Sequence, residues 1–265
     1  MDVNAINKHR YDAISEFVSL EQKNVLEIGC GNGDLLKYIA EHASVKHITG
    51  IEYWTDKEEA GNNYSIQKGN AECMDFGDNS FDAIYSFHTF EHIGDIAKAL
   101  LEIKRILKPY GKFYTQFNPI WTSIAGHHYG SKNAYSWNRE LIKRIPPWGH
   151  LYMNEDEMKN HLIKVNVEEK EAEEILSFIY HSSIINRFTR SDFLQCLTNC
   201  GMVIRQYQES VAFNRFVTSG TIEANMSSES ELTSDIITRL QNTRYDLNDI
   251  GVTAIRIVLE KYESI

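Results

Sequence analysis

The sequence predicts an α/β protein with a doubly wound sheet of seven strands and an inserted cap over the active face. Short apolar segments alternate with amphipathic helices up to about residue 118, and a glycine-rich turn joins the first such segment to a helix. The alternation stops between residues 119 and 190 and then resumes. Short strands alternating with helices are typical of parallel strands joined by crossover connections.

The elements follow from hydrophobic spacing. A first helix is predicted within the first twenty residues, where Ile6, Tyr11 and Ile14 recur near helical spacing. The seven predicted strands cover residues 24–28, 47–51, 65–68, 81–86, 112–117, 202–217 and 251–259. Further helices are predicted over residues 34–40, 96–107, 167–180, 191–200 and 232–242. This arrangement is Rossmann-like.

Composition excludes several classes of partner. The formal net charge of the 265 residues is -10, and so acidic a surface repels phosphate backbones, which argues against a nucleic acid substrate. No segment approaches the roughly 20 apolar residues that span a bilayer, and the first residues lack the apolar stretch of a signal peptide. The four cysteines form no CxxC pair. A cytoplasmic protein with reduced thiols is therefore expected; its oligomeric state is left open.

A glycine turn, Gly29-Cys30-Gly31-Asn32-Gly33, directly follows the first predicted strand. So tight a turn needs positive φ angles, which glycine adopts without steric cost, and it lets a ligand approach the backbone. Alone, this pattern also fits a dinucleotide site or an ordinary strand–helix turn. A dinucleotide fingerprint would have a later glycine within the helix, and this chain has none.

The context of the turn is more specific. Glu27 lies two residues before the first glycine, and Glu52 ends the second strand, where a carboxylate can accept hydrogen bonds from ribose hydroxyls. The segments VLEIGCGNGDLL, IE, GNAECMDFGDNSFDAIYS and LKPYGKF follow in order between residues 24 and 117. Together they resemble the class I S-adenosylmethionine-dependent methyltransferases.

This resemblance implies S-adenosyl-L-methionine as methyl donor and S-adenosyl-L-homocysteine as product. The implied donor-binding residues are Glu27, Gly29, Gly31, Gly33, Glu52, Tyr53, Asn70, Ala71, Glu72, Phe87 and His88. Glu27 and the glycine backbone would hold the methionine part, and Glu52 would hold the ribose. Tyr53 and residues 70–72 would border the adenine, and the backbone at residues 87–88 would meet the amino group. The family often has Asp where this chain has Asn70.

A methyltransferase acting on a hydroxyl must also remove its proton, and a histidine or carboxylate is the natural base. Ligands of such sheets bind beyond the carboxyl ends of the strands. The candidate catalytic residues there are Glu91, His92, His127, His128 and His150. His127 and His128 are adjacent and should point apart. A histidine base predicts a pH profile that rises near pH 6 to 7. The alternative is that these histidines are structural or solvated.

A second resemblance concerns the acceptor. The segments GHHYG, PPWGHLYMNEDEM and INRFTRSDF are similar to methyltransferases encoded with bacterial capsule and surface-polysaccharide genes. This implies an O-methyltransferase acting on a small polar acceptor, such as a sugar or phosphorylated polysaccharide precursor. The alternatives are a small-molecule N-methyltransferase, a metal-assisted O-methyltransferase using the histidines with Glu91, and a non-catalytic donor-binding regulator. A divalent metal is not expected to be required, and its ligands are unknown.

These considerations give three predicted segments. Residues 1–118 form the donor-binding core, and residues 119–190 form an inserted cap that binds the acceptor. Residues 191–265 complete the core. They contain a polar, serine-rich stretch at 219–231 that is expected to be a mobile loop.

Overall fold

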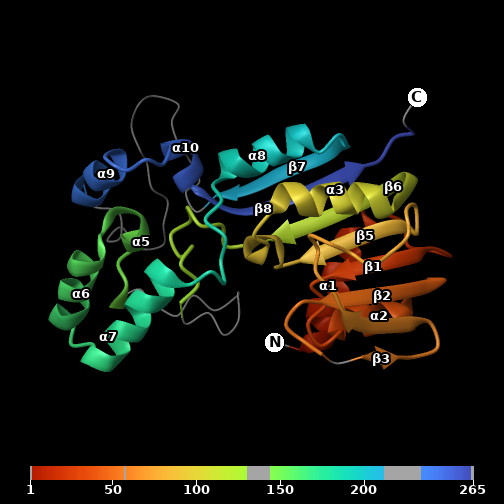
Figure 1. Ribbon diagram of the computed structural model, residues 1–265, viewed down its shortest axis with the longest axis horizontal. Helices are drawn as coiled ribbons and strands as arrows, with labels where there is room; N and C mark the ends of the chain where they lie inside the picture. The colour runs from red at the N-terminus through yellow and green to blue at the C-terminus, as the bar shows by residue number, and fades with distance from the viewer. Residues whose placement is uncertain (1, 57, 130–143, 212–233, 264–265) are drawn as a thin grey trace. The chain divides into compact units, whose positions relative to one another are not determined.

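The computed structural model describes residues 2–56, 58–129, 144–211 and 234–263 (Figure 1). The chain divides into two compact units. The first comprises Met1–Phe117, Phe193–Gln208 and Ile255–Ile265, and the second comprises Asn118–Asp192 and Glu209–Ala254. Residues 191–265, assigned wholly to the core from sequence, are thus shared between the units. The loop expected at 219–231 lies outside the described residues.

The sheet has the expected doubly wound topology. Its strands are β1 Asn24–Ile28, β2 His47–Glu52, β3 Glu59–Ala60, β4 Tyr64–Lys68, β5 Phe81–Phe87, β6 Leu107–Phe117, β7 Val203–Val211 and β8 Val252–Glu260, in the order β3-β4-β2-β1-β5-β6-β8-β7. Strands β4, β2, β1, β5 and β6 pair in parallel, and β8 is antiparallel to β6. The described residues form eight strands rather than seven. The additional strand, β3, has two residues, too few for hydrophobic alternation to reveal.

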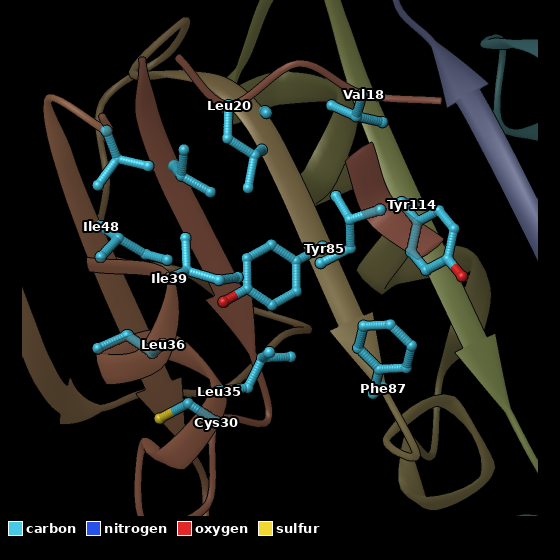
Figure 2. Packing of buried hydrophobic residues seen from close by; sticks show 14 of the residues in the cluster. Val18, Leu20, Cys30, Leu35, Leu36, Ile39, Ile48, Tyr85, Phe87 and Tyr114 are labelled. Atoms are coloured by element: carbon cyan, nitrogen blue, oxygen red, sulfur yellow. The ribbon is translucent and has the colours of Figure 1, made fainter. Parts of the chain in front are cut away.

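Helices cover both faces of this sheet (Figure 1). Helices α1 Val3–Ser15 and α2 Asp34–His42 pack on one face, and α3 Ile96–Ile106 and α8 Arg190–Asn199 lie on the other. Alternate residues of β6 serve the two faces, as the strand period requires. The Tyr114 ring packs in a hydrophobic cluster that the sheet forms with α1 and α2. The Phe117 ring contacts Phe193 of α8, with 4.8 Å between centroids. Figure 2 shows Tyr85, Phe87 and Tyr114 within that cluster.

The buried face of α1 carries Asn7, Arg10, Tyr11 and Ile14, which recur at helical spacing. Ile14 is fully buried in the core cluster. The buried Asn7 side chain donates a hydrogen bond to the carbonyl of Asp34 at 3.1 Å, which ties α1 to the start of α2. A helix predicted from its apolar residues therefore also turns two polar side chains inward.

Two predicted boundaries are corrected. Strand β6 begins at Leu107, not 112, and passes through Pro109 because it bulges there: Phe81 pairs with Leu107 but Ala83 pairs with Lys112. The helix expected over 167–180 is regular only in α7, Glu169–Leu176, and continues as a π-helical turn over Ser177–His181.

The second unit contains α5 Gly149–Tyr152, α6 Glu155–Lys164, α7, α9 Ser234–Gln241 and α10 Leu247–Ile250. Asn154 begins α6 through a capping box with Glu157. Trp148 is fully buried, and its indole N–H donates to the carbonyls of Thr122 and Ile250. This tryptophan therefore belongs to the unit's own core. Among the described residues, no helix has both the length and the hydropathy needed to cross a membrane.

Candidate functional site

The glycine turn between β1 and α2 has the backbone that its sequence predicts. Gly29, Gly31 and Gly33 have φ angles of 73°, 54° and 78°. A Cβ atom at Gly29 would lie 2.1 Å from Thr89 Oγ1, and one at Gly33 would lie 2.3 Å from Ile66 Cδ1. At Gly31 it would meet no atom within 4 Å. Two of the glycines are therefore needed for packing, whereas Gly31 is exposed and borders open space.

The Glu52 carboxylate faces this turn from the end of β2. Its Oε2 accepts the Gly31 N–H at 2.9 Å, and its Oε1 accepts the Trp54 N–H at 3.2 Å. Each carboxylate oxygen can accept a second hydrogen bond, which leaves capacity for ribose hydroxyls. The Tyr53 ring stands edge-on to the Trp54 ring, with 4.9 Å between centroids, and both side chains are exposed. Trp54 was not singled out from the sequence.

Glu27 is a buried carboxylate, with only 4% of its surface exposed. The Tyr85 hydroxyl, on the neighbouring strand, donates to its Oε2 at 3.0 Å. Burial raises the pKa of Glu27 to about 8, although the Tyr85 hydrogen bond and the positive charge of Arg10 act in the opposite direction. A buried carboxylate is stabilised by a cation, and the donor's ammonium group is a suitable one.

Glu27→Gln should make the protein more stable at alkaline pH. Because the folded state raises the pKa of Glu27 above 4.5, the stability contributed by its protonated form is complete below pH 4.5 and is lost as the pH rises through about 8. The upper limit of the loss is about 4 to 5 kcal/mol. Urea denaturation at pH 5 and pH 8.5 should show this loss in the parent and a smaller one in Glu27→Gln. Glu41→Gln, at an exposed position, is the control; equal losses in parent and Glu27→Gln would contradict the assignment.

The adenine-border residues make mainly internal contacts. Asn70 Oδ1 accepts the Glu72 N–H at 2.9 Å, and Glu72 Oε1 accepts the Asp95 N–H at 3.0 Å. Ala71 between them is buried. The side-chain oxygen of Asn70, a residue predicted to border the adenine, thus already holds this turn. The turn is in this way fixed to Asp95, the residue that caps α3.

The residues that follow β5 form another set of polar contacts. The His88 N–H donates to the Gln116 carbonyl at 3.0 Å, and the Phe87 carbonyl accepts the Thr89 hydroxyl at 3.0 Å. The backbone expected to meet the donor's amino group is therefore engaged by the fold itself. Glu91 is 2% exposed, and His88 Nδ1 lies 3.9 Å from its Oε1.

His92, one of the predicted bases, has an exposed side chain. One of its ring nitrogens nevertheless lies within 4.8 Å of a Glu91 carboxylate oxygen. The first unit thus brings the predicted residues Glu91 and His92 together with His88, which the sequence analysis had assigned only a backbone role.

The other three predicted histidines belong to the second unit. His150 is buried, and its Nε2–H donates to the Trp121 carbonyl at 2.7 Å, which places the proton on Nε2. Its Nδ1 is buried and has no hydrogen-bond partner among the described residues. The His127 ring lies 5.2 Å from the His150 ring, and its Nδ1 accepts the Tyr129 N–H. His128, half-buried, donates from Nδ1 to the Gly126 carbonyl.

The protonation of two of these histidines differs from the sequence expectation. Burial lowers the pKa of His150 to about 4, and it lowers the pKa of His127 well below the ordinary value, with nearby His150 and His128 adding to the effect. An apparent pKa of 6 to 7 is thus wrong for both. Both rings are neutral at physiological pH, and Nδ1 of His150 is a buried acceptor with no hydrogen-bond partner among the described residues.

Comparisons with known proteins agree with this geometry. Residues 26–115 match the family model described as a methyltransferase domain. This part of the first unit is thus similar to S-adenosylmethionine-dependent methyltransferases. Over 119 residues the chain is 32% identical to the sterol 24-C-methyltransferase ERG6A of Gibberella zeae, covering 41% of this chain and 31% of that enzyme. Over 117 residues it is 27% identical to a ubiquinone biosynthesis O-methyltransferase of Coxiella burnetii, covering 41% of this chain and 49% of that enzyme.

The fold is shared with solved structures. An S-adenosylmethionine-dependent methyltransferase from Mesorhizobium loti superposes with a TM-score of 0.55 at 12% identity, over 98% of this chain and all of that one. The matches to the curated relatives span less than half of either enzyme. They therefore support the similarity of residues 26–115 to a methyltransferase domain, and they do not identify the acceptor.

Four residues of the first unit that lie beside the predicted donor residues were missed from the sequence: Arg10, Trp54, Tyr85 and Thr89. Tyr85 pairs with Glu27 across β1 and β5, a register that only the assembled sheet defines. Thr89 fills the space left by Gly29. Arg10 could have been found from its helical spacing to Asn7 and Ile14 on the first helix.

Proposed function

We propose that the protein transfers a methyl group from S-adenosyl-L-methionine to an oxygen atom of a small polar acceptor, derived from a sugar or a phosphorylated polysaccharide precursor. The observation that carries the donor half of this proposal is the open space at Gly31, bordered by a turn whose N–H is bound to Glu52. A nucleoside with an amino acid end fits the donor set, because Glu52 can accept ribose hydroxyls and buried Glu27 can receive an ammonium group.

Each part of the methyltransferase domain then has a role. Bound S-adenosyl-L-methionine supplies an activated methyl group. Glu27 and the glycine turn orient its methionine part, Glu52 fixes the ribose, and Tyr53 with the turn at residues 70–72 borders the adenine. Fixed positions lower the entropic barrier to an in-line transfer.

The second unit binds the acceptor in this proposal, as the predicted cap. His150 is the preferred base because its tautomer is fixed by the Trp121 carbonyl while its Nδ1 keeps a free lone pair. It accepts the proton of the acceptor hydroxyl as the oxygen attacks. His127 is a poorer base, because its Nδ1 is occupied by the Tyr129 N–H.

The carbohydrate origin of the acceptor rests on the motifs of residues 126–193. The relatives named above act, by their names, on a sterol carbon and in ubiquinone biosynthesis, and they match only part of this chain. Those acceptors are therefore the competing choices. The cytoplasmic localisation expected from the sequence is part of the same proposal.

Calorimetric titration with S-adenosyl-L-methionine and S-adenosyl-L-homocysteine tests the donor, and both should bind. Isotopically labelled donor and mass spectrometry should then show transfer to a nucleotide sugar or sugar phosphate in a panel that also contains a catechol, a sterol and small amines. Transfer only to the catechol or sterol would replace the carbohydrate acceptor, and transfer only to amines would make the protein an N-methyltransferase. Donor binding with no transfer to any acceptor would favour a regulator, and no donor binding would reject the proposal.

A metal-assisted O-methyltransferase is the second candidate. Buried Glu91, with a ring nitrogen of His92 within 4.8 Å of its carboxylate, offers one hard oxygen and one imidazole ligand, a combination that suits Mn²⁺ better than Mg²⁺. Loss of transfer in a chelator, restored by Mn²⁺ but not in Glu91→Gln, would favour this candidate. Full activity in the chelator supports the metal-free base.

A further inference from the structure

The second unit contains an open pocket of about 510 Å³ with two arginines in its lining. The aromatic and charged lining residues are Tyr152 of α5, Arg239 of α9, and Arg244 and Tyr245 in the segment between α9 and α10. Helices α5 and α9 contact each other, so the pocket is built within this one unit. Among the described residues no carboxylate lines it. The lining therefore carries positive charge without a matching negative charge.

Arg239 is held in a fixed orientation at this pocket. Its Nη2 donates to Glu157 Oε1 at 2.7 Å, and its Cζ lies 4.8 Å from the centroid of the Tyr152 ring. Glu157 is itself held, because its other oxygen accepts the Asn154 N–H in the capping box of α6. The contact with Glu157 is the only hydrogen bond that Arg239 forms with a described side chain, and a guanidinium has five N–H donors. The remaining donors are available to a ligand.

Arg244 forms no ion pair within the described part of the chain, and Asp192 acts on it only through its charge. Its guanidinium lies 5.0 Å from the centroid of the Tyr245 ring and donates from Nη2 to the Tyr245 hydroxyl oxygen at 3.2 Å. That oxygen also accepts the Trp121 indole N–H at 2.9 Å. Because both lone pairs of the hydroxyl are used, its hydrogen needs a separate acceptor, and no described residue provides one. This O–H and the two guanidinium groups are thus donors that lack acceptors in one pocket.

The pocket adjoins the residue that fixes the proposed base. Trp121 donates its indole N–H to Tyr245 in the lining, and its carbonyl accepts the His150 Nε2–H. Leu151, which follows His150 in the chain, also lines the pocket. A group bound in the pocket is therefore held by the same small set of residues that holds His150.

We propose that this pocket binds a phosphate group of the acceptor, with Arg239, Arg244 and the Tyr245 hydroxyl as its donors. This rests on the proposed function and deepens it, because it makes a phosphorylated precursor, and not a neutral sugar, the preferred acceptor. Guanidinium groups suit phosphate because they present paired N–H donors to its oxygens. A phosphate group has three terminal oxygens to offer to these three donor groups, whereas a carboxylate has two.

The probes for this pocket are inorganic phosphate, followed by phosphorus NMR, and glucose 1-phosphate and uncharged glucose, followed by calorimetric titration. The full-length parent should bind both phosphates and not glucose. Arg244→Met should weaken both phosphates by about tenfold, as expected for the loss of a charge-assisted hydrogen bond. Arg244→Lys should lie between, because it keeps the charge but loses the paired donors. Arg244 is exposed, so thermal denaturation should show that both variants remain folded.

Lys164→Met is the matched control. Lys164 is an exposed residue of α6 in the same unit and does not line the pocket, so its loss changes the net charge equally and should leave phosphate binding unchanged. Equal affinities of parent and Arg244→Met, or equal losses in Arg244→Met and Lys164→Met, would overturn the phosphate site. Tighter binding of glucuronate or glucose than of glucose 1-phosphate would also overturn it.

The donor gives the means of separating this proposal from the proposed function. A parent that binds S-adenosyl-L-homocysteine but neither phosphate probe would overturn the phosphate site and leave methyl transfer to an unphosphorylated acceptor. A parent that binds the phosphates but not S-adenosyl-L-homocysteine would overturn the proposed function, and with it the role of the bound phosphate as part of a methyl acceptor.

Discussion

Turnover should fall by roughly 10² to 10⁴ when His150 is replaced by alanine, the range typical of removing a general base. The affinity for S-adenosyl-L-homocysteine should stay unchanged, because all the proposed donor-binding residues belong to the first unit. The expected loss depends on one atom, Nδ1 of His150. Because Nε2–H donates to the Trp121 carbonyl, Nδ1 carries the lone pair that can accept the proton. Initial rates at saturating donor, together with calorimetric titration, separate the two effects.

The pH profile gives an independent check. Because burial lowers the pKa of His150 to about 4, the base is already deprotonated at pH 5, and kcat at saturating donor should be flat from pH 5 to 8. A rise through pH 6 to 7 would point to a different base. His181→Ala, at an exposed position paired with Glu155, is the control and should keep full turnover. If alanine variants of His92, His127, His128 and His150 all keep full activity, the histidines are structural and an amine acceptor becomes the better choice.

Gly31→Val should abolish donor binding, with a loss of more than about a hundredfold, or over about 2.8 kcal/mol. The added side chain would occupy the open space that borders the turn, where a Cβ atom meets no protein atom. The substitution should affect the free energy of unfolding less than it affects ligand binding. Its cost to folding is that of a valine at a positive φ angle, about 1 to 2 kcal/mol. Calorimetric titration measures the first effect and thermal denaturation the second.

Two other glycine substitutions are the controls for this prediction. Gly201→Val also places valine at a positive φ, 67°, but beside the flexible end of Lys104 between α8 and β7, so it should lower stability and leave donor binding unchanged. Gly29→Val forces a side chain into Thr89 and should prevent folding. Unchanged affinity in a folded Gly31→Val protein would place the donor elsewhere.

The sequence predicts those parts of the molecule that depend on local pattern. Every strand except the two-residue β3, and the glycine turn with its positive φ angles, follow from residues close together in the chain, although the start of β6 did not. Tyr85 beside Glu27 and Arg10 over Phe87 depend on strand register and helix docking, which no local pattern contains. The same limit applies to the acceptor side. Its histidines were recognised, but their tautomers and lowered pKa values come from backbone carbonyls and burial created by the fold.

The antiparallel pairing of β6 with β8 has a consequence for biosynthesis. Arg256 of β8 binds Gln116 of β6 across 140 residues of chain. At about 5 to 20 residues per second, a ribosome needs roughly 7 to 28 s to make that stretch. During this time β6, a strand that pairs with β5 on one side, presents unpaired backbone groups on the other. Strands β1 to β6 are thus complete in sequence long before the edge of β6 is covered, and a nascent chain is most exposed to aggregation while the second unit is being synthesised.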